Sequence, residues 1–224
     1  MSTTSRAALG SILGTVVIVA FFGLIAFAVT PSSPRHSVAG SAVKIIITGA
    51  NGKETAHGSG VILAGDYIIT AAHVVADAKD GATILTDAGI SHHATVLWAS
   101  KDYDVALLRF EASPDDIAPA PLACRTPALG EHVRTVGNPL TQDFITSWGR
   151  VGGASRKTGP WAVIIELDMT VAPGNSGGPV YDEAGNVVAI IVGMFAVPNM
   201  LGSSPLAMTA AVPASAICML MARA

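Results

Sequence analysis

The stretch Pro173-Gly174-Asn175-Ser176-Gly177-Gly178-Pro179 is the most informative part of this sequence. A serine between glycines can belong to an ordinary loop. A nucleophilic serine, however, needs a tight turn that exposes its hydroxyl, and it needs backbone N–H groups that face the oxygen anion formed during acyl transfer. Neighbouring glycines supply both properties. The stretch therefore makes Ser176 a candidate nucleophile, for which the rest of the chain must supply a base.

A nucleophilic serine needs a general base, and the base needs a carboxylate that orients it. Of the six histidines, His73 stands out because it ends an apolar run, Ile68–Ala72, although a histidine in such a place can also be a buried residue satisfied by its neighbours. Asp104 opens the apolar run 104–110 and is the candidate acid, with Asp102 as its competitor. A charge at the start of a strand can also be a simple turn residue. The three candidates follow one another in the order His, Asp, Ser, which differs from the order in α/β-hydrolases and subtilisins.

Composition excludes several classes of protein. The 224 residues are 50% hydrophobic and 13% charged, with a mean hydropathy of +0.53, which excludes intrinsic disorder. The net charge of -3 argues against a nucleic-acid partner. We expect no metal or other cofactor, because neither H-E-x-x-H nor C-x-x-C occurs in the sequence.

Short apolar or alternating runs separated by turn residues predict an all-β fold. A proline-rich connection at 111–128 divides these runs into two sets. The pattern favours two β-barrels of about six antiparallel strands each, at about 42–112 and 128–212, followed by a C-terminal helix over 213–224. The expected strands are Val43–Thr48, Gly58–Leu63, Tyr67–Thr70, Thr83–Thr86, Ala94–Trp98, Val105–Phe110, His132–Val136, Ile145–Val151, Trp161–Leu167, Val187–Val192 and Met208–Val212.

The most hydrophobic part of the chain is residues 7–29, which carry no charge. At about 1.5 Å per residue, a helix of this length crosses a hydrocarbon core of about 30 Å. The run is longer than a signal-peptide core, so we favour an uncleaved transmembrane anchor over a signal sequence, although Ala26-Phe27-Ala28 fits a cleavage site. A tail (1–6) precedes the anchor, and a linker (30–41) leads to a domain over 42–224. We expect a single-pass membrane protein with this domain on the extracytoplasmic side.

Four segments together resemble the chymotrypsin-fold serine proteases, most nearly the HtrA/DegP-like branch: GSGVIL (58–63), YIITAAHVV (67–75), DVALLRF (104–110) and PGNSGGPV (173–180). The resemblance extends over about residues 42–220. It implies a double β-barrel that acts as an endopeptidase on proteins or peptides. It also implies that His73 is the general base, that Asp104 orients it and that Ser176 is the nucleophile. The N–H groups of Gly174 and Ser176 would form the oxyanion hole.

The resemblance also indicates which residues the protein would accept before the cleaved bond. The residue six before the nucleophile lines the base of the specificity pocket in this family, and here it is the uncharged Thr170. Ile191, Val192 and Gly193 would form the pocket wall. These residues carry no charge, so we expect cleavage after small or medium apolar residues.

Three features depart from the family. Asn175 replaces the aspartate that pairs with a newly cut N-terminus in pancreatic-type relatives, so we expect no zymogen cleavage. We expect no PDZ domain after the protease domain, because few residues follow Ser176. No aromatic residue occurs in 30–43, so the trimer seen in relatives is not supported and the oligomeric state stays open.

The chain has two cysteines, Cys124 in the connection and Cys218 in the expected terminal helix. They are compatible with a disulfide in an oxidising compartment, and the alternative is two free thiols. The leading hypothesis is a membrane-tethered serine endopeptidase. A catalytically silent relative that binds peptides or a partner protein in the same cleft is the runner-up, and a purely structural membrane-anchored domain would leave the spacing of the three candidates unexplained.

Overall fold

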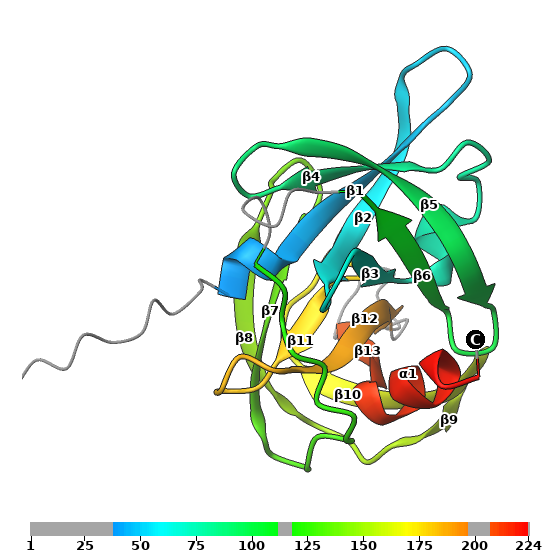
Figure 1. The fold of residues 1–224 in the computed structure, drawn as a ribbon. Coiled ribbons are helices and arrows are strands. Elements are labelled where there is room, and N and C mark those ends of the chain that lie inside the picture. The colour runs from blue at the N-terminus through cyan, green and yellow to red at the C-terminus, as the bar shows by residue number, and fades with distance from the viewer. Residues whose placement is uncertain (1–37, 112–117, 197–206, 224) are drawn as a thin grey trace, which may run out of the picture. The chain divides into compact units, whose positions relative to one another are not determined.

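A computed structural model describes residues 38–111, 118–196 and 207–223, all of which belong to one unit, Arg35–Ala224. The described chain is mostly β-structure and ends in one α-helix (Figure 1). Residues 7–29, the expected membrane anchor, lie outside the described residues. Among the described residues, no helix is long and apolar enough to cross a membrane.

The first set of strands closes into the six-stranded antiparallel barrel that the sequence predicts. The order around the barrel is β1-β2-β3-β6-β5-β4, and β1 pairs with both β2 and β4, so that no edge is left open. A 3-10 helix, η1 (Val38–Ser41), precedes the barrel, and another, η2 (Ala72–Val75), follows β3. The strands are β1 (Ala42–Thr48), β2 (Glu54–Ile62), β3 (Tyr67–Thr70), β4 (Ala82–Thr86), β5 (Ser91–Ser100) and β6 (Val105–Phe110).

The second set forms a seven-stranded sheet in the order β13-β12-β11-β7-β8-β10-β9, in which β13 also pairs with β10. The prediction of a second six-stranded barrel is therefore confirmed only as a second antiparallel set. Two of its strands, β9 and β11, were not predicted, because three residues are too few to show an alternating pattern. The strands are β7 (His132–Gly137), β8 (Ile145–Val151), β9 (Arg156–Thr158), β10 (Trp161–Asp168), β11 (Pro179–Tyr181), β12 (Val187–Ala196) and β13 (Ala207–Pro213).

The core consists of the apolar side chains that the strands turn inward. Ile45, Ile68 and Leu108 of barrel one are fully buried, as are Ile164 and Ile190 of the second sheet. The C-terminal helix α1 (Ala214–Met221) begins directly after Pro213. Proline has no backbone N–H, so it cannot donate the hydrogen bond that a position inside a helix requires. A helix was predicted for this end of the chain, and the structure shows that it packs on the strands β12 and β13.

The connection between the two sets is tied to the second sheet by a disulfide. Cys124 and Cys218 are bonded in the structure, at a sequence separation of 94. A cross-link over a loop of this length stabilises a fold by about 4–5 kcal/mol through the loss of unfolded-state entropy. Next to the bond, the Arg125 carbonyl accepts a hydrogen bond from the Ser215 N–H in α1 (3.1 Å). The connection and the terminal helix therefore hold one another in place.

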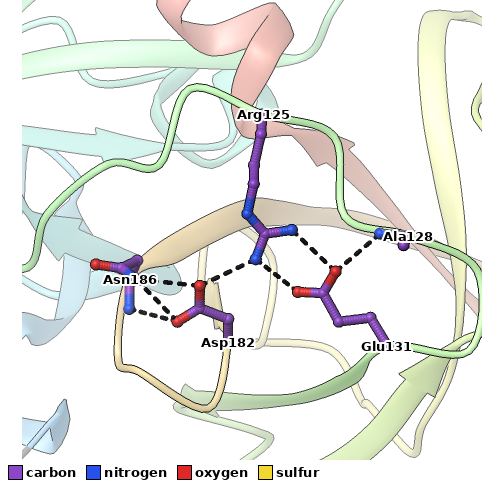
Figure 2. A network of polar contacts seen from close by, with 5 residues as sticks. All are labelled: Arg125, Ala128, Glu131, Asp182 and Asn186. Atoms are coloured by element: carbon purple, nitrogen blue, oxygen red, sulfur yellow. Dashed lines mark hydrogen bonds and ion pairs between the residues drawn. The ribbon is translucent and has the colours of Figure 1, made fainter.

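Arg125 also joins two carboxylates (Figure 2). Its guanidinium donates to Glu131 at 2.6 and 2.9 Å and to Asp182 at 3.0 Å. The hydrogen bond from Arg125 lowers the pKa of Glu131. Burial alone would raise the pKa of Asp182, but hydrogen bonds from Asn186 and from Arg125 together lower it. Carboxyl groups whose pKa is lower in the folded state stabilise the fold above their ordinary pKa, and this contribution is lost as the pH falls.

Replacing Arg125 by methionine removes the cation and keeps a long side chain. We expect Arg125→Met to lower the free energy of unfolding by roughly 1 kcal/mol at pH 7, because half-exposed ion pairs contribute little. The difference from wild type should shrink below the ordinary carboxyl pKa values of 4.5 and 3.8, where protonation removes the stabilisation in both proteins. Urea unfolding of both proteins at pH 7 and at pH 3 measures this difference in the free energy of unfolding. Arg109→Met is the control, since Arg109 is exposed and makes no ion pair with any described residue. An equal difference at both pH values would contradict this linkage.

Candidate active site

Strand pairing brings His73 and Asp104 together. His73 lies in η2, directly after β3, and Asp104 directly precedes β6. The strands β3 and β6 are antiparallel neighbours with Thr70 opposite Ala106, so the end of one lies beside the start of the other. The sequence motifs that carry the two residues are therefore adjacent in space although far apart in the chain.

The Asp104 carboxylate holds His73 by two hydrogen bonds. Oδ1 accepts the His73 backbone N–H at 2.9 Å, and Oδ2 lies 2.8 Å from Nδ1 of the imidazole ring. Because Nδ1 is engaged by the carboxylate, Nε2 is the ring atom left to exchange a proton with another group. The Asp102 side chain is exposed and is not bonded to His73, whereas its backbone carbonyl accepts the Ala162 N–H at 2.7 Å. Of the two candidate acids, the structure brings only Asp104 to the histidine.

Asp104 occupies a backbone conformation that few residues adopt. Its φ is +53°, in the left-handed region, which aspartate tolerates better than most residues with a Cβ. The conformation is held by hydrogen bonds from the Asp104 N–H to the Lys101 carbonyl (3.3 Å) and from the Ala72 N–H to the Asp104 carbonyl (3.1 Å). The indole nitrogen of Trp161 lies 3.4 Å from Oδ2, the same oxygen that faces the His73 ring. The acid is thus fixed from both its backbone and its side chain.

Ser176 lies on the loop between β10 and β11, where two glycines are required. Gly174 and Gly177 have φ values of +101° and +84°, which residues with a side chain rarely adopt. A Cβ at Gly174 would lie 2.1 Å from the Asn138 carbonyl oxygen, and one at Gly177 would lie 2.1 Å from the Ser59 carbonyl oxygen. Both positions therefore exclude any larger residue.

Between Gly174 and Gly178, the hydrogen bonds among the described residues leave two N–H groups free. Every carbonyl from Ala172 to Ser176 accepts a hydrogen bond, from Asn175 N, Leu140 N, Ser59 Oγ, Gly178 N and Ser59 N in that order. The N–H groups of Asn175, Gly177 and Gly178 all donate. Within the described part of the chain, the N–H groups of Gly174 and Ser176 have no acceptor. Unpaired donors of this kind beside a serine hydroxyl can bind an oxygen anion. They are the two groups that the sequence resemblance assigns to the oxyanion hole.

A pocket of about 240 Å³ lies beside Ser176. Two of the four residues predicted to form a specificity pocket, Ile191 and Gly193, line it, whereas Thr170 and Val192 do not. The sequence reasoning missed the loop residues just before Gly174, which are recognisable only by their place next to the glycine-rich segment. The lining residues are Val171, Ala172, Pro173, Ser176, Ile191, Gly193 and Met194.

Local backbone geometry explains the two residues that do not line this pocket. The pairing of β12 with β13 shifts between Ile191 and Gly193, so Val192 is the extra residue of a bulge and its side chain is buried in the core. Thr170 lies just beyond β10 and is exposed, whereas its neighbour Met169 is buried. Both residues therefore point away from the pocket as the structure forms it.

No set of three His, Cys, Asp or Glu side chains within residues 38–111, 118–196 and 207–223 could hold a metal ion. The structure places a histidine held by a carboxylate at the end of β3, and a serine hydroxyl with two free backbone N–H groups on the loop between β10 and β11. These groups are suited to proton transfer and to nucleophilic attack on an acyl carbon.

Comparison with known proteins places this arrangement in a family. The sequence profile of the trypsin-like peptidase domain matches residues 58–190. Protease Do-like 1, chloroplastic, of Arabidopsis thaliana is 34% identical over 131 residues, which are 55% of this chain and 30% of the relative. A probable periplasmic serine endoprotease DegP-like of Brucella suis is 32% identical over 151 residues, or 64% of this chain and 28% of the relative. The chain thus spans less than a third of the length of these relatives.

The fold is shared with a solved structure. The serine endoprotease from Yersinia pestis superposes with a TM-score of 0.69 over 83% of this chain and 62% of that chain, at 24% sequence identity. This likeness shows the fold alone. Because the family profile covers more than half of the sequence, the chain belongs to the trypsin-like peptidase family, and its relatives include serine endoproteases of the HtrA/DegP type.

Proposed function

We propose that this chain is a serine endopeptidase in which His73, Asp104 and Ser176 form the catalytic triad. The observation that carries the proposal is the pair of unpaired N–H groups at Gly174 and Ser176, in a segment where the N–H groups of Asn175, Gly177 and Gly178 all donate. Two free donors beside a serine hydroxyl can bind the oxygen anion that forms during acyl transfer. The Asp104–His73 hydrogen bond and the relationship to serine endoproteases support the same function.

The proposed reaction uses only groups of this chain and water. Ser176 Oγ attacks the scissile carbonyl while His73 Nε2 takes the hydroxyl proton, and Asp104 stabilises the imidazolium through Nδ1. The N–H groups of Gly174 and Ser176 bind the oxyanion of the tetrahedral intermediate. His73 then gives the proton to the departing amine, which leaves an acyl ester on Ser176. Water, deprotonated by His73, hydrolyses this ester and restores the hydroxyl.

The pocket beside Ser176 supports cleavage after small or medium apolar residues. Its lining is aliphatic or backbone in character apart from Ser176 itself, and it contains no charged side chain. A charged substrate residue would lose its water there without gaining a partner.

We also propose that the peptidase domain is tethered to a membrane by residues 7–29 and faces an oxidising, extracytoplasmic compartment. The uncharged run supports the tether. The Cys124–Cys218 disulfide supports the compartment, because such bonds persist where thiols are not kept reduced. Relatives named as periplasmic endoproteases agree with this location.

A fluorophosphonate probe tests the proposed activity directly. We expect the full-length protein in detergent to be labelled at Ser176, and we expect both labelling and turnover of a peptide substrate to disappear in Ser176→Ala. This substitution removes only the hydroxyl group of residue 176, so we expect the fold to stay the same. Circular dichroism of the variant and the wild type checks this. A folded wild-type protein that is neither labelled nor active would instead support the peptide-binding, catalytically silent alternative.

Amide variants of the two candidate acids identify the residue that orients His73. Asp104→Asn should lower kcat by about 10⁴-fold and leave the fold intact, because an amide N–H would hold the wrong tautomer of the imidazole. Asp102→Asn is the matched control and should retain activity within about threefold, as its side chain is not bonded to His73. Steady-state kinetics on one peptide substrate measures both. The reverse order of effects would assign the acid to Asp102.

A peptide library tests the predicted cleavage preference. We expect peptides with Ala, Val or Leu before the scissile bond to be cleaved at least about 100-fold more efficiently than peptides with Arg, Lys, Asp or Glu there, since an unpaired buried charge costs several kcal/mol. The readout is kcat/KM by mass spectrometry of the products, with Ser176→Ala as the blank. Preferred cleavage after basic residues would refute the pocket assignment.

A further inference from the structure

Ser59 of β2 is a fully buried hydroxyl that touches the nucleophile loop. Its Oγ lies 2.7 Å from the Gly174 carbonyl oxygen, 2.9 Å from the Asn138 backbone nitrogen and 3.0 Å from Asn138 Nδ2. A serine hydroxyl has one hydrogen and two acceptor lone pairs. Both Asn138 groups are donors and occupy the lone pairs. The hydroxyl hydrogen can therefore point only to the Gly174 carbonyl.

Asn138, which is also fully buried, is held in a single orientation. Its amide nitrogen donates to the Val43 carbonyl (3.2 Å) as well as to Ser59, and its Oδ1 accepts the Phe144 N–H at 3.1 Å. Turning the amide over would set its oxygen against the Val43 carbonyl and its nitrogen against the Phe144 N–H. The amide orientation and the direction of the Ser59 hydroxyl thus fix one another.

These contacts act on the residue that needs support. Glycine at φ +101° has no side chain to resist rotation, so its neighbours must fix the conformation of Gly174. Ser59 holds the carbonyl that follows the Gly174 Cα, and the Leu140 N–H holds the preceding Pro173 carbonyl at 2.7 Å. In a planar trans peptide the N–H points opposite to the C=O. The Leu140 bond therefore holds the peptide plane that carries the Gly174 N–H, and the Ser59 bond holds the next plane. Together they restrict rotation about the two backbone bonds of Gly174 that join these planes.

We propose that Ser59 and Asn138 are positioning residues that aim the Gly174 N–H into the oxyanion hole. The proposal rests on the proposed endopeptidase function and concerns the same site. Neither residue touches the substrate: Asn138 directs the Ser59 hydroxyl, Ser59 holds the Gly174 carbonyl, and the Gly174 N–H meets the oxyanion. Without the hydroxyl, the Gly174–Asn175 peptide is held only by the hydrogen bond from the Asn175 N–H to the Ala172 carbonyl (3.0 Å), so rotation at Gly174 is less restricted and the direction of its N–H is less closely defined.

A purely structural role is the competing explanation, because the same contacts join barrel one to the second sheet. The two roles differ in what they change. Loss of a purely structural contact lowers the stability of the fold and changes the affinity for all ligands to the same extent. Loss of a positioning group weakens only the binding of a species that carries the oxyanion, and so it lowers kcat more than it raises KM.

Ser59→Ala is the test, made in the full-length protein. We expect kcat for a peptide substrate to fall about 10–100-fold with KM within about threefold of wild type, since a misdirected donor loses part of what an absent donor loses. The affinity of a peptide aldehyde, whose adduct with Ser176 carries an oxyanion, should fall by the same factor as kcat. The affinity of the corresponding peptide alcohol, which forms no adduct, should not change.

Tyr181→Phe is the matched control. It removes another buried hydroxyl, one that lies 2.6 Å from Ser41 Oγ and links the start of barrel one to β11 away from Gly174. We expect it to lower the melting temperature and to leave kcat and aldehyde affinity as in wild type. If Ser59→Ala does not fold, Ser59→Cys replaces it, because the thiol keeps the shape and is a weak donor; kcat should then lie below wild type.

The outcomes separate this inference from the proposed function. If wild type turns over, Ser176→Ala is inactive, and the Ser59 variant loses no more kcat than Tyr181→Phe, the positioning role is refuted and the peptidase stands. The same holds if the Ser59 variant raises KM while its kcat and aldehyde affinity are unchanged. If wild type itself is inactive and unlabelled, the proposed function fails and the inference fails with it.

Discussion

The hydrogen bond from the Ser59 N–H to the Ser176 carbonyl, at 2.8 Å, is the contact on which the geometry of the site depends. His73 and Asp104 belong to barrel one, whereas Ser176 belongs to a loop of the second sheet, so the two parts must be aligned to within a fraction of an ångström. Ser59 aligns them through three of its atoms: its N–H binds Ser176, its Oγ binds Gly174, and its carbonyl accepts the Thr70 hydroxyl at 2.7 Å. Thr70 in turn ends the strand that leads to His73.

Glycines make this close approach possible. A Cβ at Gly177 would lie 2.1 Å from both the Ser59 carbonyl oxygen and the Thr70 hydroxyl, and a Cβ at Gly137 would lie 2.3 Å from Asn175 Oδ1. The backbone of the nucleophile loop therefore packs directly on barrel one with no side chain between. The cost is that such a loop has little stiffness of its own, because glycine restricts its backbone least. Rigidity has to come from hydrogen bonds supplied by neighbouring strands.

The sequence was sufficient to predict the features that have a local signature. Barrel one follows from alternating apolar runs and turn residues. His73 and Asp104 are recognisable as candidates because they lie at the ends of such runs, and Ser176 because it lies between glycines. The second sheet was less predictable: β9 and β11 are three residues long, and β12 carries a bulge at Val192. A bulge depends on pairing with β13, which is distant in sequence. Likewise, Ser59 and Asn138 are single polar residues next to glycine, and nothing in the sequence marks them as partners. Only the folded chain shows that Asn138 bonds to Ser59 and that Ser59 bonds to Gly174.

The fold and the site are stabilised by different kinds of interaction, and this division has a consequence for pH. The connection between the two strand sets is held by charges at Arg125, Glu131 and Asp182, so acid weakens it. The hydrogen bonds that fix Gly174 come from a hydroxyl, an amide and backbone groups, none of which ionises in the range where proteins remain folded. Protonation of the carboxylates around Arg125 therefore loosens the connection without altering the direction of the Gly174 N–H.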